Sequence, residues 1–193
     1  MNSLPQTKAD NQVTVKGKLT DHNNTPVKNT DIQITINGKL YGDNDYTNIT
    51  KVTVKTNDNG IYNYTYKPNS GGNYTITIRK SGDENYNANQ TQTTLNVDPI
   101  DTNITVNPIT NAHVNQKTNI TGKLTDENGN PLKQTSVGII IDNNKIYVKT
   151  DTNGKYTYEY TPTTTGTKNI KIYYGGYHKY AYSITTLNLD VKT

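Results

Sequence analysis

The chain has 193 residues and a formal net charge of +4 at pH 7, and it contains no cysteine. The lack of cysteine excludes disulfides, zinc fingers and thiol nucleophiles, and no apolar run approaches the roughly 20 residues of a membrane-spanning helix. The basic residues are spread along the chain, so we expect neither a nucleic-acid partner nor membrane insertion of this fragment.

The composition predicts an all-β protein. Tyrosine is the only large aromatic residue, with 16 copies and no phenylalanine or tryptophan, and asparagine and threonine are abundant. Threonine and tyrosine favour strands, whereas asparagine and glycine favour turns. With no other large ring available, tyrosine must supply the aromatic part of any core while its hydroxyl stays at the sheet margin.

Apolar residues alternate with polar ones in short segments of the first half, a pattern that predicts strands with one buried face. Turn-forming residues separate these segments. Asn57-Asp58-Asn59-Gly60 has the composition of a hairpin turn, because asparagine, aspartate and glycine tolerate a positive φ. The predicted strands cover residues 13–19, 32–36, 52–54, 61–66, 74–78 and 95–97.

The second half of the chain repeats the first. The segment Gly17–Asp21, with the sequence Gly-Lys-Leu-Thr-Asp, returns unchanged at Gly122–Asp126. A unit of roughly 90 residues repeated head to tail indicates a modular array. Short strands in this number and spacing predict two tandem immunoglobulin-like Greek-key β-sandwich domains, at residues 1–98 and 99–193.

Two features distinguish the copies. The first copy carries an insertion at residues 38–50, and the second begins with an apolar alternation at residues 102–106 that has no evident counterpart before Gln12. We expect that the first strand of domain 1 is truncated in this chain. The alternative is that the unpaired sheet edge accepts a strand from a neighbouring molecule.

The two units are joined by the segment Asp98-Pro99-Ile100-Asp101. So short a linker, stiffened by its proline, allows little free tumbling. We therefore expect an elongated, monomeric rod, with Asp98, Pro99, Asp101 and Tyr177 at the domain junction.

The most aromatic stretch of the chain lies at residues 173–182, around a Gly-Gly turn. Exposed tyrosines beside such a turn are able to stack on sugar rings. This makes Tyr173, Tyr174, Tyr177 and Tyr180 the candidate ligand-binding residues. The competing interpretation is that Tyr177 packs against the neighbouring unit at the junction.

The sequence predicts no catalytic residues, no metal site and no cofactor. Nucleophilic catalysis needs a base beside an activated side chain, but the three histidines, His22, His113 and His178, are scattered and are not repeated between the copies. Asp98 and Asp101 offer oxygen ligands, so a calcium site at the junction stays open as an alternative.

Three segments carry motifs of a known family: Gly-Lys-Leu-Thr-Asp-Glu-Asn-Gly-Asn-Pro-Leu at residues 122–132, Thr150–Tyr156, and Gly82-Asp83-Glu84-Asn85-Tyr86. They resemble the bacterial immunoglobulin-like repeats of intimin- and invasin-type surface proteins, the last through a Gly-Asp-x-x-Tyr motif. The abundance of asparagine, threonine and lysine is similar to that of adhesin-like proteins from methanogenic archaea. The motifs identify the module, and they carry over neither catalytic residues nor a ligand.

The resemblance implies a non-catalytic adhesin on the cell surface, of which this chain is an extracellular fragment of a larger anchored protein. Its modules would mediate or extend attachment to other cells or host surfaces, through surface glycans or proteins. Two alternatives stay open. The repeats could form a purely structural stalk without a ligand, or an accessory carbohydrate-binding module of a surface enzyme.

Overall fold

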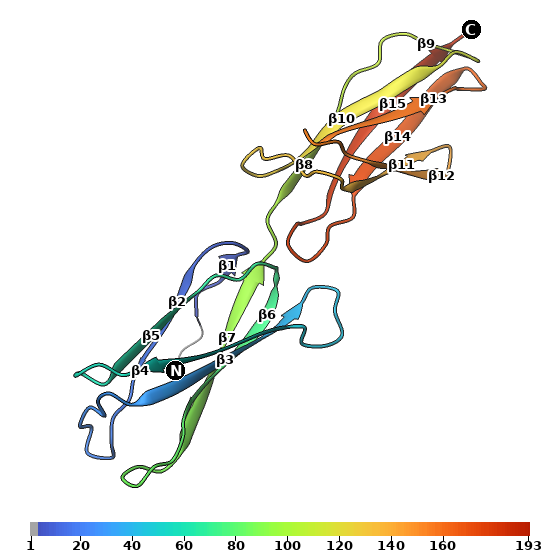
Figure 1. Ribbon diagram of the computed structural model, residues 1–193. Helices are drawn as coiled ribbons and strands as arrows, with labels where there is room; N and C mark the ends of the chain where they lie inside the picture. The colour runs from blue at the N-terminus through green and yellow to red at the C-terminus, as the bar shows by residue number, and fades with distance from the viewer. Residues whose placement is uncertain (1–3) are drawn as a thin grey trace. The chain divides into compact units, whose positions relative to one another are not determined.

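The computed structural model describes residues 4–193. The chain divides into two compact units, and the boundary along the chain lies between Pro99 and Ile100. Residues 4–193 contain no helix, and therefore none of the length and apolarity needed to cross a membrane. Strands joined by turns and loops make up each unit (Figure 1). The prediction of an all-β protein is confirmed.

The strands of unit 1 cover the predicted segments, except that the first of these segments ends at Lys18 and not at Leu19. They are β1 (Thr7–Lys8), β2 (Val13–Lys18), β3 (Asp31–Leu40), β4 (Asn48–Lys55), β5 (Ile61–Tyr66), β6 (Gly72–Lys80) and β7 (Asn89–Asp98). One sheet has the strand order β1-β7-β6-β3-β4, and the other consists of β2-β5 (Figure 1). Successive side chains of a strand point to opposite faces, so Ile32, Ile34 and Ile36 of β3 are all buried in the core.

Unit 2 repeats this arrangement with one additional strand. Its strands are β8 (Thr102–Val106), β9 (Ala112–His113), β10 (Thr118–Asp126), β11 (Ser136–Ile141), β12 (Asn144–Lys149), β13 (Lys155–Tyr160), β14 (Gly166–Tyr174) and β15 (Ser183–Lys192). One sheet has the order β12-β11-β14-β15-β9, and the other has the order β13-β10-β8. The buried residues of both sheets form one hydrophobic cluster.

The start of unit 1 holds a short strand that was not among the predicted ones. β1 pairs in parallel with β7, as β9 pairs in parallel with β15 in unit 2. A strand of two residues is too short to show an alternating pattern, which is why the sequence did not reveal it. The one strand of unit 2 that has no counterpart among the described residues of unit 1 is β8.

The insertion at residues 38–50 lengthens a hairpin. β3 and β4 stay paired as far as Gly38 and Asn48, and residues 41–47 close the hairpin. In unit 2 the corresponding strands β11 and β12 are joined by Asp142 and Asn143 alone, both of which have a positive φ. The two hairpins therefore differ in length but pair their strands in the same way.

Tyrosine supplies the aromatic part of both cores, as predicted. Burial raises the pKa of each core tyrosine, because an ionised phenolate would lose its hydration there. The pKa of Tyr74 rises to about 12. The buried tyrosines are Tyr62, Tyr66 and Tyr74 in unit 1 and Tyr156 and Tyr174 in unit 2.

Four tyrosines lie across a glycine of the neighbouring strand. A Cβ atom added to any of these glycines would come within 2.1 to 2.5 Å of the tyrosine side chain, so only glycine leaves room for the ring. In each pair the two residues are directly opposite in the strand register. The pairs are Gly17–Tyr62, Gly38–Tyr74, Gly122–Tyr156 and Gly138–Tyr173.

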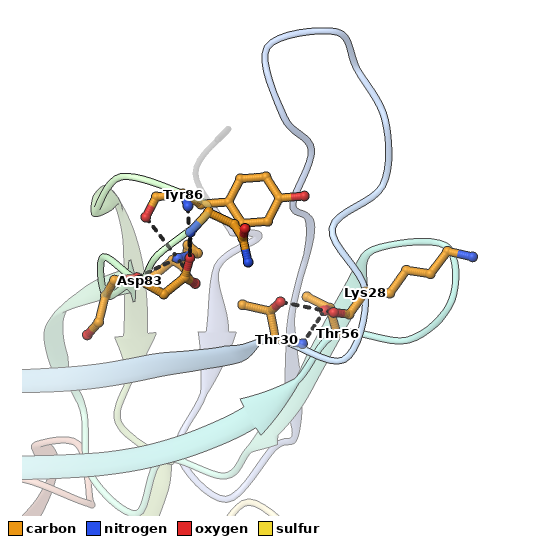
Figure 2. Close-up of polar contacts among 8 residues, drawn as sticks. Lys28, Thr30, Thr56, Asp83 and Tyr86 are labelled. Carbon is orange, nitrogen blue, oxygen red and sulfur yellow. Dashed lines mark hydrogen bonds and ion pairs between the residues drawn. The ribbon is translucent and has the colours of Figure 1, made fainter.

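A buried threonine closes the same turn in both units, and Figure 2 shows Thr56 of unit 1 beside Thr30. The Thr56 hydroxyl donates to the carbonyl oxygen of Val27 at 2.8 Å and accepts the N–H of Thr30 at 3.0 Å. Thr150 makes the equivalent pair of hydrogen bonds in unit 2, at 2.6 and 2.9 Å. A buried hydroxyl requires such partners, so this repeated contact belongs to the fold.

The Gly-Asp-x-x-Tyr motif of unit 1 also has a structural role (Figure 2). Asp83 Oδ1 accepts the backbone N–H groups of Asn85 and Tyr86 at 2.9 and 2.8 Å. Its Oδ2 accepts a hydrogen bond at 2.6 Å from Nζ of Lys80, a lysine that is buried. These contacts hold the pKa of Asp83 below its usual range, and the hydrogen bond from Lys80 contributes most. The motif therefore shapes a loop and neutralises a buried ammonium group.

We expect the protein to unfold in alkaline solution as its core tyrosines ionise. A tyrosine whose folded pKa exceeds the unfolded value of about 10 stabilises the fold fully below that pH. The stabilisation is lost as the pH rises towards about 12, the pKa of Tyr74. Tyrosinate absorbance and far-UV circular dichroism should therefore change together above about pH 10. Complete ionisation of the tyrosines with an unchanged dichroism spectrum would contradict this expectation.

The hydroxyls of Tyr156 and Tyr62 should contribute differently to stability. The Tyr156 hydroxyl donates to the carbonyl oxygen of Thr105 at 2.6 Å, whereas the Tyr62 hydroxyl has no hydrogen-bond partner within residues 4–193. We expect Tyr156→Phe to lower the free energy of unfolding of unit 2 by about 1 kcal/mol. Tyr62→Phe should leave that of unit 1 nearly unchanged. Hydrogen exchange of core amides measures both units separately, and equal losses would refute this difference.

Candidate functional site

A row of large side chains crosses the outer face of one sheet of unit 2. Gly138 of β11 lies opposite Tyr147 of β12 on one side and Tyr173 of β14 on the other, and Tyr173 lies opposite Ile184 of β15. Residues directly opposite one another in adjacent strands have their side chains on the same face. The ring of Tyr182 lies 6.4 Å from that of Tyr173. We name Tyr147, Tyr173, Tyr182 and Ile184 the aromatic row.

The aromatic row is accessible to solvent. Tyr147, Tyr182 and Ile184 are 58%, 55% and 50% exposed, and Tyr173 is half-buried because its ring lies over Gly138. The hydroxyls of Tyr173 and Tyr147 are 3.2 Å apart and hydrogen-bonded. Large apolar side chains that gather on a surface in this way mark interaction sites more often than isolated ones do.

Lys145 adds a positive charge at the edge of the aromatic row. Its Nζ atom lies 5.2 Å from the ring centroids of both Tyr147 and Tyr173, within the range of cation–π attraction. Hydrogen bonding to these two hydroxyls raises the pKa of Lys145, and the same ammonium group lowers the pKa of Tyr147. The surface thus combines exposed ring faces with hydroxyl and ammonium groups that form hydrogen bonds.

Unit 1 has no such row at the equivalent positions. In unit 1, the four residues at the strand positions that correspond to Tyr147, Gly138, Tyr173 and Ile184 are all polar. They are Thr53 of β4, Gln33 of β3, Arg79 of β6 and Gln90 of β7. The aromatic row is therefore not required by the fold that the two copies share.

The structure does not bring the four predicted tyrosines together on one surface. Tyr173 belongs to the aromatic row, but Tyr174 is its neighbour along β14 and so points to the opposite face. Tyr174 is 8% exposed and forms part of the core. Its ring supports the fold and is not accessible to a ligand.

Tyr177 and Tyr180 lie in the loop that follows β14. Their backbones exchange hydrogen bonds of 3.0 and 3.1 Å. Tyr177 is 71% exposed and stacks on the ring of His178 at 3.9 Å, whereas Tyr180 is partly buried against the core of unit 2. Tyr177 is thus an exposed residue of its own unit, and its location at the domain junction stays a prediction.

Three residues of the aromatic row were missed by the sequence analysis. Tyr147 alternates with Ile146 and Val148 in β12, and Tyr182 and Ile184 lie near the start of β15. Alternation alone assigns Tyr147 to one face of its strand. Only the pairing of β12, β11, β14 and β15 shows that these side chains meet, and no local pattern encodes that register.

The expected junction residues make contacts within their own units. The carboxylate of Asp98, at the end of β7, accepts a hydrogen bond from Nε2 of Gln6 at 2.6 Å. The carbonyl oxygen of Asp101 accepts the N–H of Glu127 at 2.9 Å. Within residues 4–193, no three acidic or histidine side chains gather to hold a metal ion. A role of Asp98, Pro99 and Asp101 in fixing one unit against the other stays a prediction.

No protein-family model matches the sequence, and no curated protein matches it. The fold does match solved structures. The crystal structure of invasin, a bacterial integrin-binding protein, is 20% identical over 95% of this chain and 37% of its own, with a TM-score of 0.50. The D0-D1 domains of intimin are 19% identical over 98% of this chain and 95% of their own, with a TM-score of 0.40. The fibronectin(III)-like modules of Clostridium thermocellum CbhA are 16% identical over 98% of this chain and 90% of their own, with a TM-score of 0.40.

At these identities the likeness concerns the fold alone. With the sheet topology, the likeness to invasin confirms the prediction of immunoglobulin-like β-sandwich domains. The matched part is little more than a third of the invasin chain, so integrin binding is a property of that protein. For this chain, function has to be argued from its own surface.

Proposed function

We propose that the aromatic row of unit 2 binds saccharide rings, and that this chain is a non-catalytic attachment fragment of an adhesin-like cell-surface protein. The exposed row across four strands is the observation that supports the proposal most directly. Tyrosine rings offer apolar faces to the C–H groups of a sugar, and their hydroxyls form hydrogen bonds with its hydroxyl groups. Lys145 attracts acidic sugars in particular.

The dimensions of the row favour an extended glycan. Adjacent strands are about 4.8 Å apart, so the three intervals from β12 to β15 span about 14 Å. The row lies on an open sheet face, which suits a chain of several sugar rings better than a single enclosed ring. Tyrosine is also enriched in protein interfaces, so a protein ligand on the opposing cell is the competing outcome of the test.

For unit 1 we propose a spacer role. Its equivalent row is polar, and a surface of threonine, glutamine and arginine offers no ring to a sugar. An extracellular, surface-attached location follows from the proposed attachment role. An archaeal source rests on the similarity of composition alone.

Removal of two exposed rings should abolish glycan binding. We expect the variant Tyr147→Ala/Tyr182→Ala to lose at least about tenfold in apparent affinity, which corresponds to about 1.4 kcal/mol. The measurement is binding of the whole chain to a glycan array, followed by titration with the best-bound glycan. Both rings are more than half exposed, so the fold should persist, as judged by circular dichroism.

The matched control is Tyr177→Ala, which removes a more exposed ring outside the aromatic row. This variant should bind as the unchanged protein does. If Tyr177→Ala lost binding while Tyr147→Ala/Tyr182→Ala retained it, the site would lie in the loop after β14. If the unchanged protein bound no glycan at all, the proposed ligand class would be wrong.

A further inference from the structure

Lysine residues flank the aromatic row on both sides. Lys145 and Lys149 lie two residues before and two residues after Tyr147 in β12, so all three side chains are on the outer face of the sheet. Lys145 of β12 and Lys171 of β14 both lie opposite Ile140 of β11. These two lysines therefore share one side of the aromatic row, and Lys149 lies on the other side. We name Lys145, Lys149 and Lys171 the flanking lysines.

The ammonium groups of the flanking lysines are accessible to a ligand. All three residues are exposed. Lys145 lies against the rings of the aromatic row, whereas the side chains of Lys149 and Lys171 form neither an ion pair nor a hydrogen bond within residues 4–193. An anionic group of a ligand therefore has no carboxylate of the protein to displace from these two lysines.

Acidic side chains are distant from the row or already paired. Among the outward-facing residues of β12, β11, β14 and β15, the single carboxylate is that of Asp190, which accepts a hydrogen bond from the Thr167 hydroxyl at 2.6 Å. Thr167 lies six residues from Tyr173 along β14, a distance of about 20 Å. Asp142, in the turn between β11 and β12, forms an ion pair of 3.1 Å with Lys168. The surface around the aromatic row is therefore positively charged.

The equivalent face of unit 1 has a different distribution of charge. The counterpart of Lys149 is Lys55, which forms an ion pair of 2.7 Å with Asp31, the residue opposite it in β3. Unit 2 has the uncharged Ser136 at the position of Asp31. The counterpart of the flanking lysine in β14 is Thr77. Beside its row of rings, unit 2 thus has one acidic residue fewer and one basic residue more, and the shared fold requires neither difference.

The spacing of the flanking lysines suits several anionic groups at once. Successive outward-facing residues of a strand are about 7 Å apart, so the lysines begin about 7 Å to either side of the row. Each ammonium group is a point charge on a flexible four-carbon stem, which lets it reach a group beside a ring that lies on the tyrosines. A single acidic sugar carries too few charges to pair on both sides of the row.

We propose that the ligand of the aromatic row is an anionic polysaccharide, whose rings lie on the tyrosines and whose acidic groups pair with the flanking lysines on both sides. This inference rests on the saccharide-binding function proposed above and names the class of saccharide. A lysine ammonium accepts a carboxylate or a sulfate group as its partner, and both occur on acidic polysaccharides. The probes below separate these two sources of charge.

Two matched pairs of polysaccharides test the charge of the ligand. Polygalacturonate is compared with its methyl ester, and dextran sulfate is compared with dextran, so that within each pair the backbone is the same. We expect the whole chain to bind at least one charged polymer about tenfold or more tightly than its uncharged partner, as measured by isothermal titration calorimetry. Binding of only one charged polymer would identify the acidic group as carboxylate or as sulfate.

The variant Lys149→Gln/Lys171→Gln tests the flanking lysines that touch no ring. We expect it to bind the charged polymer about fivefold more weakly, because each exposed ion pair contributes a factor of about two. The matched control Lys39→Gln/Lys51→Gln removes the same charge from exposed residues on the outer face of unit 1, and it should bind as the unchanged protein does. Equal losses in the two variants would indicate attraction to net charge alone and would overturn the proposal.

Salt gives a second measurement of the same contacts. Raising the ionic strength from about 0.1 M to about 1 M shortens the screening length from about 10 Å to about 3 Å. Binding of the charged polymer by the unchanged protein should weaken more steeply with salt than binding by Lys149→Gln/Lys171→Gln. The same salt dependence in both proteins would contradict a direct role of these lysines.

Three further results would overturn the proposal. The first is equal affinity for the charged and uncharged members of both pairs, with binding still lost in Tyr147→Ala/Tyr182→Ala, which would leave the saccharide-binding function standing. The second is undiminished binding of the charged polymer by Tyr147→Ala/Tyr182→Ala, which would locate the acidic ligand outside the aromatic row. The third is binding of none of the four polysaccharides. In that case the glycan array shows whether the saccharide-binding function fails as well.

Discussion

The pairing of a glycine with a tyrosine on the neighbouring strand is the contact on which both units depend. A chain without phenylalanine or tryptophan has to fill its cores with a ring that carries a hydroxyl. Laying the ring over a glycine brings it flat against the sheet and directs the hydroxyl to the margin. Tyr74 and Tyr156 show the result, because both rings are 1% exposed and both hydroxyls reach a backbone carbonyl oxygen.

The same contact also accounts for what distinguishes the units. Gly138 and Tyr173 repeat the glycine–tyrosine pair on the outer face of unit 2, and there the ring joins Tyr147, Tyr182 and Ile184 to form a surface. In unit 1, the pair Gly17–Tyr62 lies beside a strand edge that no described residue covers. The same glycine–tyrosine pair thus occurs in the cores and on the exposed face that carries the aromatic row, depending on which face of the sheet the tyrosine occupies.

The sequence predicted the main strands well but not which exposed side chains meet on one face, for a physical reason. Alternation identified the main strands and the role of tyrosine in the cores, because burial on one face of a strand is a local property. It missed β1, which has two residues, and it grouped Tyr173 with Tyr174, which point to opposite faces. The aromatic row is assembled from β12, β14 and β15, and the register that aligns them depends on the whole sheet.

The most direct test of this account is the NMR chemical shift of the glycine Hα protons. Gly17, Gly38, Gly122 and Gly138 should each show a ring-current displacement from the ordinary glycine position, because a tyrosine ring lies against each of them. Gly42 and Gly129 have no heavy atom near a Cβ position and serve as references. Ordinary shifts for the four paired glycines would show that the rings lie elsewhere, and both the packing of the cores and the aromatic row would have to be reconsidered.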